Sequence, residues 1–504
     1  MARDQMQDVV LVEVTDLDGA EVAASAAPAG RADASREGAQ APRRALAARR
    51  LRRWWPVAAG LVLVLVVTSL VGAVRARERA ARLAVVPGVL APLDPGLAER
   101  WRAPLRGWGQ IDTVAGSLVL AGRDGSGRTG VVALDPVTGR QRWSAPLDEV
   151  AETGDAWCVP LDGSAAAAPY VACRLVRSAV LRAQDGTYQW DGPALLVVLD
   201  ARTGERVAER ALPGEQVLLA AFGGGLVVTS LRADRVAQVT LEDPVTGDVT
   251  WSFAGDEPLP PSTTGPLALY PSVEGDVLVV NGPVTWAFDP DGELVAEWHL
   301  RGGDRAVAGG WRLEVTALPD GRFAVGESGG VGTGREEYGT VARADGSESI
   351  PIPGPVLLPQ VDDGSMRGLL LTSSPSWSGI VALDASTGEK VWESDATLDG
   401  GVLVLDGRVI LGGGRELRAL DARSGAELWA VDAPTGTQAS QVLTDGRVLV
   451  VPMTDPDLGP VLAALDPADG RTRWTTPLPA DAYHLTVVDG RLVALTDRDL
   501  VALG

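Results

Sequence analysis

The sequence has few of the side chains on which catalysis and metal binding usually depend. Its 504 residues include two histidines, two cysteines and one asparagine, Asn281. His299 and His484 are not spaced as a metal-binding pair, and two imidazoles cannot supply a generous metal site or acid–base network. We therefore expect no catalytic residue, no metal ligands and no cofactor-binding residues.

Basic residues are outnumbered by acidic ones. The formal net charge is −21, and Lys390 is the only lysine beside 44 arginines. A surface this acidic repels phosphate backbones, which disfavours nucleic-acid binding. The arginine excess, with abundant Ala, Gly and Val, is typical of a GC-rich bacterial genome.

A ten-residue phrase recurs through the chain: Leu-Asp-x-x-(Thr/Ser/Asp)-Gly-x-x-x-Trp. Repetition at intervals of tens of residues indicates a repeat architecture. Full copies occupy 134–143, 383–392, 420–429 and 465–474; altered copies occupy 199–208 and 241–251, and a shortened copy 288–292.

Each phrase joins two strand-like stretches through a turn, and many are preceded by an Asp-Gly hairpin such as 404–411. Two hairpins make a four-stranded sheet of about forty residues, which is a propeller blade. Residues 100–105 resemble the outer strand at 142–147, so the first strand is expected to complete the last blade. We count nine units, but propellers usually have four to eight blades. Treating the weak unit at Ala342 as part of a neighbour predicts eight blades, with nine as the alternative.

The phrase resembles the repeat of PQQ-like (quinoprotein-type) β-propellers over residues 99–504. The resemblance implies that the repeated tryptophans pack against neighbouring blades: Trp101, Trp143, Trp251, Trp392, Trp429 and Trp474. Enzymes of that family are quinone-dependent dehydrogenases whose sites have adjacent cysteines and a calcium with acidic and amide ligands. This chain has no adjacent cysteines and a single Asn, so we do not carry the cofactor over.

Nineteen uncharged residues, 56–74, are long enough to span a bilayer. Six arginines precede them closely and four follow, which predicts a cytoplasmic N-terminus and an extracytoplasmic propeller. The expected order is a disordered cytoplasmic tail (1–53), a transmembrane helix (54–75), a linker (76–98) and the propeller (99–504). A cleaved signal peptide is the alternative. Residues 6–14 are either a docking motif for a cytoplasmic partner or an incidental apolar stretch.

The two cysteines, Cys158 and Cys173, are flanked by strand-like residues. Neighbouring antiparallel strands bring such residues within bridging distance, and an external compartment permits the bond. We therefore expect a disulfide.

Three short motifs are better explained without chemistry. Residues 326–330 match Gly-x-Ser-x-Gly but lie in a β context, and 330–334 lack the strand and helix of a dinucleotide site. Asp289 and Asp291 begin like a calcium loop, but the later ligands are absent and the segment aligns with the repeat turn.

These observations predict an all-β, closed β-propeller of four-stranded blades, preceded by one transmembrane helix. Its function is expected to be that of a non-catalytic binding or scaffold module for a protein or cell-envelope ligand. The expected binding surface is the loops of one face and the channel mouth, especially the insertion at 161–192. The first alternative is a quinone- or metal-dependent oxidoreductase with its site in the propeller channel. The second is a scaffold resembling the propeller lipoprotein of outer-membrane barrel assembly, although the lipid-anchoring cysteine is missing.

Overall fold

The computed structural model describes most of the chain from Arg82 onward. The described residues are 82–83, 86, 88–104, 111–123, 128–147, 154–161, 169–183, 186–260, 267–300, 312–328, 338–374, 379–396, 400–413, 416–432, 442–479 and 481–504. The chain divides into two units, Met1–Arg77 and Glu78–Gly504, and the described residues all belong to the second. The expected tail and transmembrane helix lie outside the described residues. Within the described part, no helix has both the length and the apolar character needed to cross a membrane.

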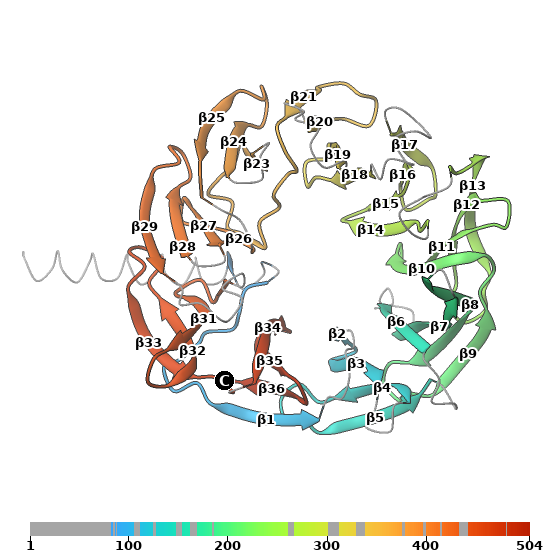
Figure 1. Ribbon diagram of the computed structural model, residues 1–504, viewed down its shortest axis with the longest axis horizontal. Coiled ribbons are helices and arrows are strands. Elements are labelled where there is room, and N and C mark those ends of the chain that lie inside the picture. The colour runs from blue at the N-terminus through green and yellow to red at the C-terminus, as the bar shows by residue number, and fades with distance from the viewer. Residues whose placement is uncertain are drawn as a thin grey trace, which may run out of the picture. The chain divides into compact units, whose positions relative to one another are not determined.

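The described strands of Glu78–Gly504 form nine sheets that follow one another around a ring (Figure 1). We number them as blades 1 to 9. Blade 1 contains β2 (Ile111–Val114), β3 (Ser117–Arg123), β4 (Thr129–Leu134) and β5 (Gln141–Pro146); blade 2 contains β6 (Gly154–Leu161), β7 (Tyr170–Ala183), β8 (Gly186–Asp200) and β9 (Arg206–Ala211); blade 3 contains β10 (Glu215–Phe222), β11 (Gly225–Leu231), β12 (Val236–Glu242) and β13 (Val249–Pro258).

The middle of the chain forms three further blades. Blade 4 contains β14 (Tyr270–Glu274), β15 (Val277–Asn281), β16 (Val284–Phe288) and β17 (Leu294–His299); blade 5 contains β18 (Arg312–Ala317), β19 (Phe323–Ser328), β20 (Gly339–Ala342) and β21 (Ile350–Ile352); blade 6 contains β23 (Leu369–Ser373), β24 (Ile380–Asp384) and β25 (Lys390–Ser394).

The last three blades contain the C-terminal strands, one strand that precedes blade 6 in the sequence, and the first strand of the propeller. Blade 7 contains β22 (Val361–Asp362), β26 (Val402–Leu405), β27 (Arg408–Gly413), β28 (Glu416–Asp421) and β29 (Glu427–Asp432); blade 8 contains β30 (Leu443–Thr444), β31 (Leu449–Asp455), β32 (Gly459–Leu465) and β33 (Thr472–Pro477); blade 9 contains β34 (Ala482–Val488), β35 (Arg491–Thr496), β36 (Asp499–Leu503) and β1 (Glu99–Pro104).

The blade count corrects the prediction of eight. Residues around Ala342 belong to blade 5, a sheet of its own, instead of extending a neighbour. Its signal is weak because Arg343 stands where other copies have the turn Asp and Ile350 stands where they have Trp. Strand pairing does not depend on those two side chains, so the sheet forms without them.

Burial follows from the stacking of blades face to face. The middle strands lie between two neighbouring blades and are buried on both faces, as in β26, where all four residues are buried. The outer strands alternate, as in β5, where Trp143 and Ala145 are buried between exposed residues. Each of the nine clusters of buried apolar residues joins two adjacent blades, including blade 9 with blade 1.

The two ends of the propeller meet in blade 9. Strand β1 pairs antiparallel with β36, in the register Trp101↔Ala502. Arg102 also forms an ion pair with Asp499, at 2.8 Å. The first strand therefore completes the last blade, which removes one free sheet edge.

Two other segments depart from a simple blade order. Leu357 donates its backbone N–H to Leu371 of blade 6 (2.9 Å), and a few residues later Val361 pairs in parallel with Leu403 of blade 7. Ahead of β1, the N–H groups of Leu90 and Ala91 donate to Thr444 (2.8 Å) and Gly490 (2.7 Å), so residues 88–98 lie across blades 8 and 9.

Candidate functional site

The repeated tryptophans lie on the turn glycines of the next blade. A β-carbon added to Gly204, which has a φ of +74°, would stand 2.5 Å from the ring of Trp143. Only a glycine permits both that backbone conformation and that approach. We call the surface of such a glycine a seat. Trp101, Trp251, Trp392 and Trp429 occupy the seats at Gly139, Gly292, Gly425 and Gly470.

Most seated indoles also donate a hydrogen bond to the turn. The Nε1 of Trp143 donates to the carbonyl of Ala201 (3.0 Å), and that of Trp392 to Ala422 (2.9 Å). The equivalent bonds of Trp101 and Trp429 go to Pro136 (3.2 Å) and Pro467 (3.1 Å). Trp474 is only half-buried. It faces blade 9, where no turn joins the two outer strands β36 and β1, and Gly504 donates to Ala98 (3.1 Å).

Two seats hold a different side chain. In blade 2 the position of the docking tryptophan is Ala208, and Arg210 lies against Gly247 instead, 3.3 Å from a β-carbon added there. Arg210 forms an ion pair with buried Glu242. Burial raises the pKa of the Glu242 carboxyl although the guanidinium beside it acts in the opposite direction. Ile350 occupies the remaining seat of this kind, at Gly388.

One seat is open. Ala296 pairs with Ala287 in blade 4 as Trp143 pairs with Ala133 in blade 1, so an alanine stands at the tryptophan position. The facing turn glycine is Gly346 of blade 5, and no described atom lies within 4 Å of a β-carbon added to it. Eight described glycines lie in the turn between the two outer strands of a blade, and among these Gly346 is the one that no side chain of the preceding blade covers.

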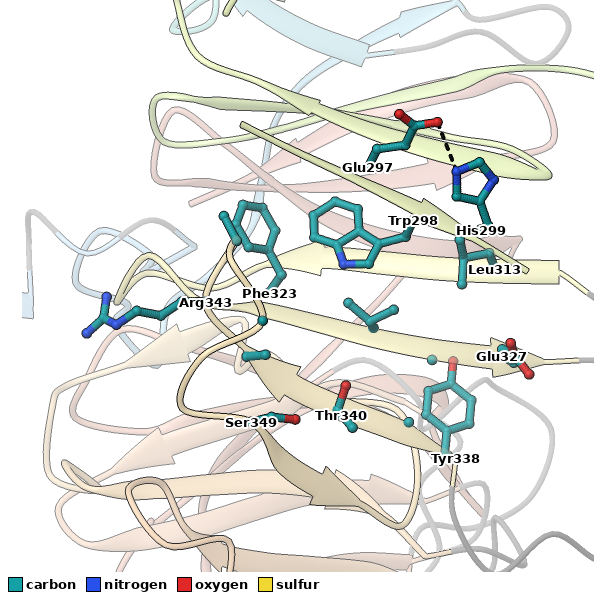
Figure 2. Close-up of a pocket in the computed structure, with 16 residues that line it drawn as sticks. Glu297, Trp298, His299, Leu313, Phe323, Glu327, Tyr338, Thr340, Arg343 and Ser349 are labelled. Carbon is teal, nitrogen blue, oxygen red and sulfur yellow. Dashed lines mark ion pairs between the residues drawn. The ribbon is translucent and has the colours of Figure 1, made fainter. Parts of the chain in front are cut away.

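A cavity of about 680 Å³ lies beside the open seat, between β17 of blade 4 and the strands of blade 5. Figure 2 shows Trp298 and Phe323 side by side on one wall, with Thr340 and Ser349 on the wall opposite. The ring centroids of Trp298 and Phe323 are 4.9 Å apart. Trp298 comes two residues after Ala296 and thus lies on the same face of β17. It lines the cavity next to the seat and does not cover Gly346.

Charged groups surround both ends of the cavity. At one end Glu297 pairs with His299 (3.0 Å), and the Tyr338 hydroxyl donates to Glu314. Burial, together with the Glu314 carboxylate, raises the pKa of the Tyr338 phenol. At the other end Arg343 pairs with Glu348 (2.9 Å). The cavity therefore combines an aromatic wall with carboxylates.

The described residues contain no group of three or more metal-ligating side chains. Gly326 and Ser328 lie within strand β19, so they do not form the strand-to-helix turn of a hydrolase nucleophile. Asp289 accepts the backbone N–H groups of Asp291 (3.0 Å) and Glu293 (2.9 Å), which is the role of a turn residue. His484 lies in β34 of blade 9, where burial lowers the pKa of its imidazole.

The expected disulfide is present. Cys158 of β6 and Cys173 of β7 face each other in the ladder, with their Cα atoms 4.0 Å apart. The insertion at 161–192 contains a β-hairpin in its described part. The β7–β8 ladder continues to Ala183↔Gly186, beyond Arg177, the last residue that β7 pairs with β6.

The open seat was not predicted from the sequence. The signal was an alanine at the tenth position of a shortened phrase, but Trp298 two residues later masks it. Only the register of β16 with β17 shows which of the two residues faces Gly346.

One family model matches the C-terminal part of this chain. Residues 377–503 match the PQQ_2 family model, described as outer membrane protein assembly factor BamB. This match confirms the resemblance to PQQ-like repeats for blades 6 to 9.

Two curated relatives match over short stretches. The serine/threonine-protein kinase AfsK of Streptomyces griseus is 37% identical over 128 residues, which is 23% of this chain and 15% of the kinase. The outer membrane protein assembly factor BamB of Moranella endobia is 27% identical over 143 residues, 24% of this chain and 36% of that protein. The chain thus spans less than two thirds of either relative.

Solved structures are similar over most of the chain at low identity. BamB from Moraxella catarrhalis is 16% identical, covering 81% of this chain and 99% of that one, with a TM-score of 0.42. The quinohemoprotein alcohol dehydrogenase of Comamonas testosteroni is 14% identical, covering 85% and 84%, with a TM-score of 0.39.

Proposed function

We propose that this chain is a non-catalytic binding or scaffold module whose nine-bladed propeller binds a protein or a cell-envelope polymer. The observation that carries the proposal is the open seat at Gly346. A side chain of the preceding blade covers each of the other seven described glycines in the turn between outer strands, whereas this one adjoins a cavity of about 680 Å³. Cavities of that size fall in the range of ordinary ligand pockets.

The match of residues 377–503 to a family described as an outer membrane protein assembly factor supports a scaffold role. BamB carries that description by name, and we extend to this chain only the general role of a protein-binding propeller. The β7–β8 hairpin, with the Cys158–Cys173 bond near its base, is a second candidate contact surface. Its backbone extends past the four-stranded part of blade 2, where a partner strand has access to it.

We further propose that the propeller lies outside the cytoplasmic membrane, held by a helix at 54–75. The support is the uncharged run at 56–74 with six arginines before it and four after it. Protease added to intact cells should then digest the propeller and leave a cytoplasmic control protein whole. A propeller that survives until the cells are lysed would contradict the topology.

Site-specific photo-crosslinking in intact cells tests the binding function. A photoreactive amino acid at Ser349, which lines the cavity, should give a discrete adduct of higher mass. The matched control is Val137, which is 59% exposed on the turn of blade 1, beside a filled seat. Equal adducts from Ser349 and Val137 would contradict the proposal. So would the absence of an adduct both at Ser349 and at Ala183 of the β7–β8 hairpin.

A further inference from the structure

We propose that the cavity at Gly346 binds a peptide segment of a partner protein that inserts a tryptophan into the open seat and directs a nearby lysine or arginine to the opposite end of the cavity. This inference rests on the proposed binding function and specifies the chemistry of the partner.

The propeller itself shows what a seat accepts. The turn of blade 5 closes through Arg343 N–H to Ser347 (2.9 Å) and Gly346 N–H to Arg343 (2.9 Å). The turn of blade 4 closes in the same way, with Asp289 N–H to Glu293 and Gly292 N–H to Asp289, both at 3.1 Å. The seat of that second turn holds the indole of Trp251. A turn with the same hydrogen bonds therefore accommodates an indole when one is offered.

The turn carbonyl that accepts the indole N–H in other blades also lines the cavity. In four occupied seats, all on turns one residue longer, the indole N–H donates to the carbonyl of the second turn residue, as Trp143 does to Ala201. Trp251, on the turn of blade 4, has no partner for its Nε1 among the described residues. Counted from the closing hydrogen bond, the second turn residue of blade 5 is Ala344, which lines the cavity. A partner tryptophan thus gains an apolar seat and brings an N–H that a turn carbonyl can accept, whereas phenylalanine or leucine gains only the seat.

The volume of the cavity beside the seat is large enough for more than one side chain. At about 680 Å³ the cavity has room for an indole and for the neighbouring residues of a peptide. Trp298 and Phe323 offer an aromatic wall on which those residues can pack.

The charge at the far end selects a cationic neighbour. Glu297 and Glu327 line the cavity there, and Glu314 accepts the hydrogen bond of Tyr338. A carboxylate can accept several hydrogen bonds, so Glu314 and Glu297 can each serve a further donor in addition to their present partners. The only cation among the described lining residues besides His299 is Arg343, which Glu348 already neutralises. An acidic peptide would be repelled at this end, as it would by the overall charge of −21.

The test measures peptide binding to the full-length protein in detergent by isothermal titration calorimetry. The probe is acetyl-Gly-Lys-Gly-Trp-Gly-Lys-Gly-amide, and the comparison peptides replace Trp by Ala or both Lys by Glu. We expect saturable binding of the probe and at least about tenfold weaker binding of each comparison peptide, since each lost contact of this kind changes an equilibrium constant by that order.

The decisive variant is Ala296→Trp, which supplies the missing indole from within the chain. It should abolish probe binding and raise the melting temperature. The matched control is Ala208→Trp, at the same register position of blade 2, where Arg210 already occupies the seat; probe binding should be unchanged. If Ala296→Trp does not fold, Glu327→Lys replaces it and should shift preference toward the Glu peptide.

Undiminished probe binding by folded Ala296→Trp, or equal binding of the Trp and Ala peptides, would overturn the inference. So would a wild-type protein that binds none of the peptides. A crosslinked partner at Ser349 with no peptide binding would preserve the binding function and reject only the indole chemistry. Absence of peptide binding together with absence of an adduct at both Ser349 and Ala183 would reject the function as well.

Discussion

The indole of Trp429 lies over Gly470 of the next blade so closely that a β-carbon on that glycine would stand 2.7 Å from the ring. The same indole donates from Nε1 to the carbonyl of Pro467, at 3.1 Å. One side chain thus provides apolar contact and a directed hydrogen bond between two sheets that share no backbone ladder. Trp101, Trp143 and Trp392 make interblade contacts of the same kind, and the open seat at Gly346 lacks any such contact.

Replacing Trp429 by alanine should destabilise the propeller by about 3–5 kcal/mol, because the change leaves a cavity and removes the hydrogen bond. The matched control is Trp157→Ala, since Trp157 is 50% exposed and should cost little. Denaturant titration followed by circular dichroism measures both. Equal effects of the two substitutions would contradict a docking role for Trp429.

Removing the disulfide by changing Cys158 and Cys173 together to alanine should lower stability by about 3 kcal/mol, the chain-entropy value for a loop of this length. The bond joins residues 15 apart in sequence. Reductant should destabilise the wild type by a similar free energy and lower its melting temperature. The melting temperature of the double variant should not change with reductant. Alkylation of protein from intact cells should label no thiol unless reductant is added first; ready labelling would contradict both the bond and the external location.

Acid should weaken the blades through their turn aspartates. A hydrogen bond from the Ser386 hydroxyl is the main cause that lowers the pKa of Asp384 from 3.8 to about 2. The backbone N–H groups of Ser386 and Thr387 lower it further. A carboxyl whose pKa is depressed on folding stabilises the native state above its unfolded pKa and loses that contribution as pH falls through its folded pKa. The melting temperature should therefore fall between about pH 4 and pH 2.

The Ser386→Ala variant tests the cause of that acid effect. It removes the hydroxyl hydrogen bond, which should move the Asp384 pKa toward its ordinary value and reduce the acid-dependent loss at this turn. Asp384→Asn should remove that turn's contribution to the pH dependence. A melting temperature that is constant from pH 4 to pH 2 in the wild type would refute the assignment.

Pyrroloquinoline quinone with calcium should not raise the melting temperature of the purified protein, since a ligand that binds the native state alone must stabilise it. The amide of Asn281 is already engaged, donating to the Val315 carbonyl (3.2 Å) and accepting the Val315 N–H (3.0 Å). Calcium alone is the control for weak binding to surface carboxylates. A saturable rise with quinone, together with dye-linked oxidation of an alcohol or sugar, would favour the oxidoreductase alternative.

The local sequence determined most of the strands and turns of this fold because each copy of the repeat phrase contains the residues that form its own turn and flanking strands. The Asp of each phrase accepts the turn N–H groups, as Asp384 does from Ser386 and Thr387, both at 2.9 Å. The Gly supplies a positive φ, 74° at Gly388, and the flanking strands alternate. Propeller class and the Cys158–Cys173 bond could be predicted from such short-range patterns, and the pairing of the first and last propeller strands from the likeness of residues 100–105 to 142–147.

The tertiary structure decided what depends on the blade before and the blade after. Arg343 and Ile350 break the phrase in blade 5, and the sequence therefore predicted eight blades. The backbone ladder of blade 5 does not need the Asp and Trp of the phrase, and it forms the ninth sheet. The open seat depends on Ala296 of one blade facing Gly346 of the next without reaching it, a relationship between residues fifty positions apart that no pattern within either blade contains. The phrase specifies one blade at a time, whereas a binding cavity between blades exists only once two of them are packed together.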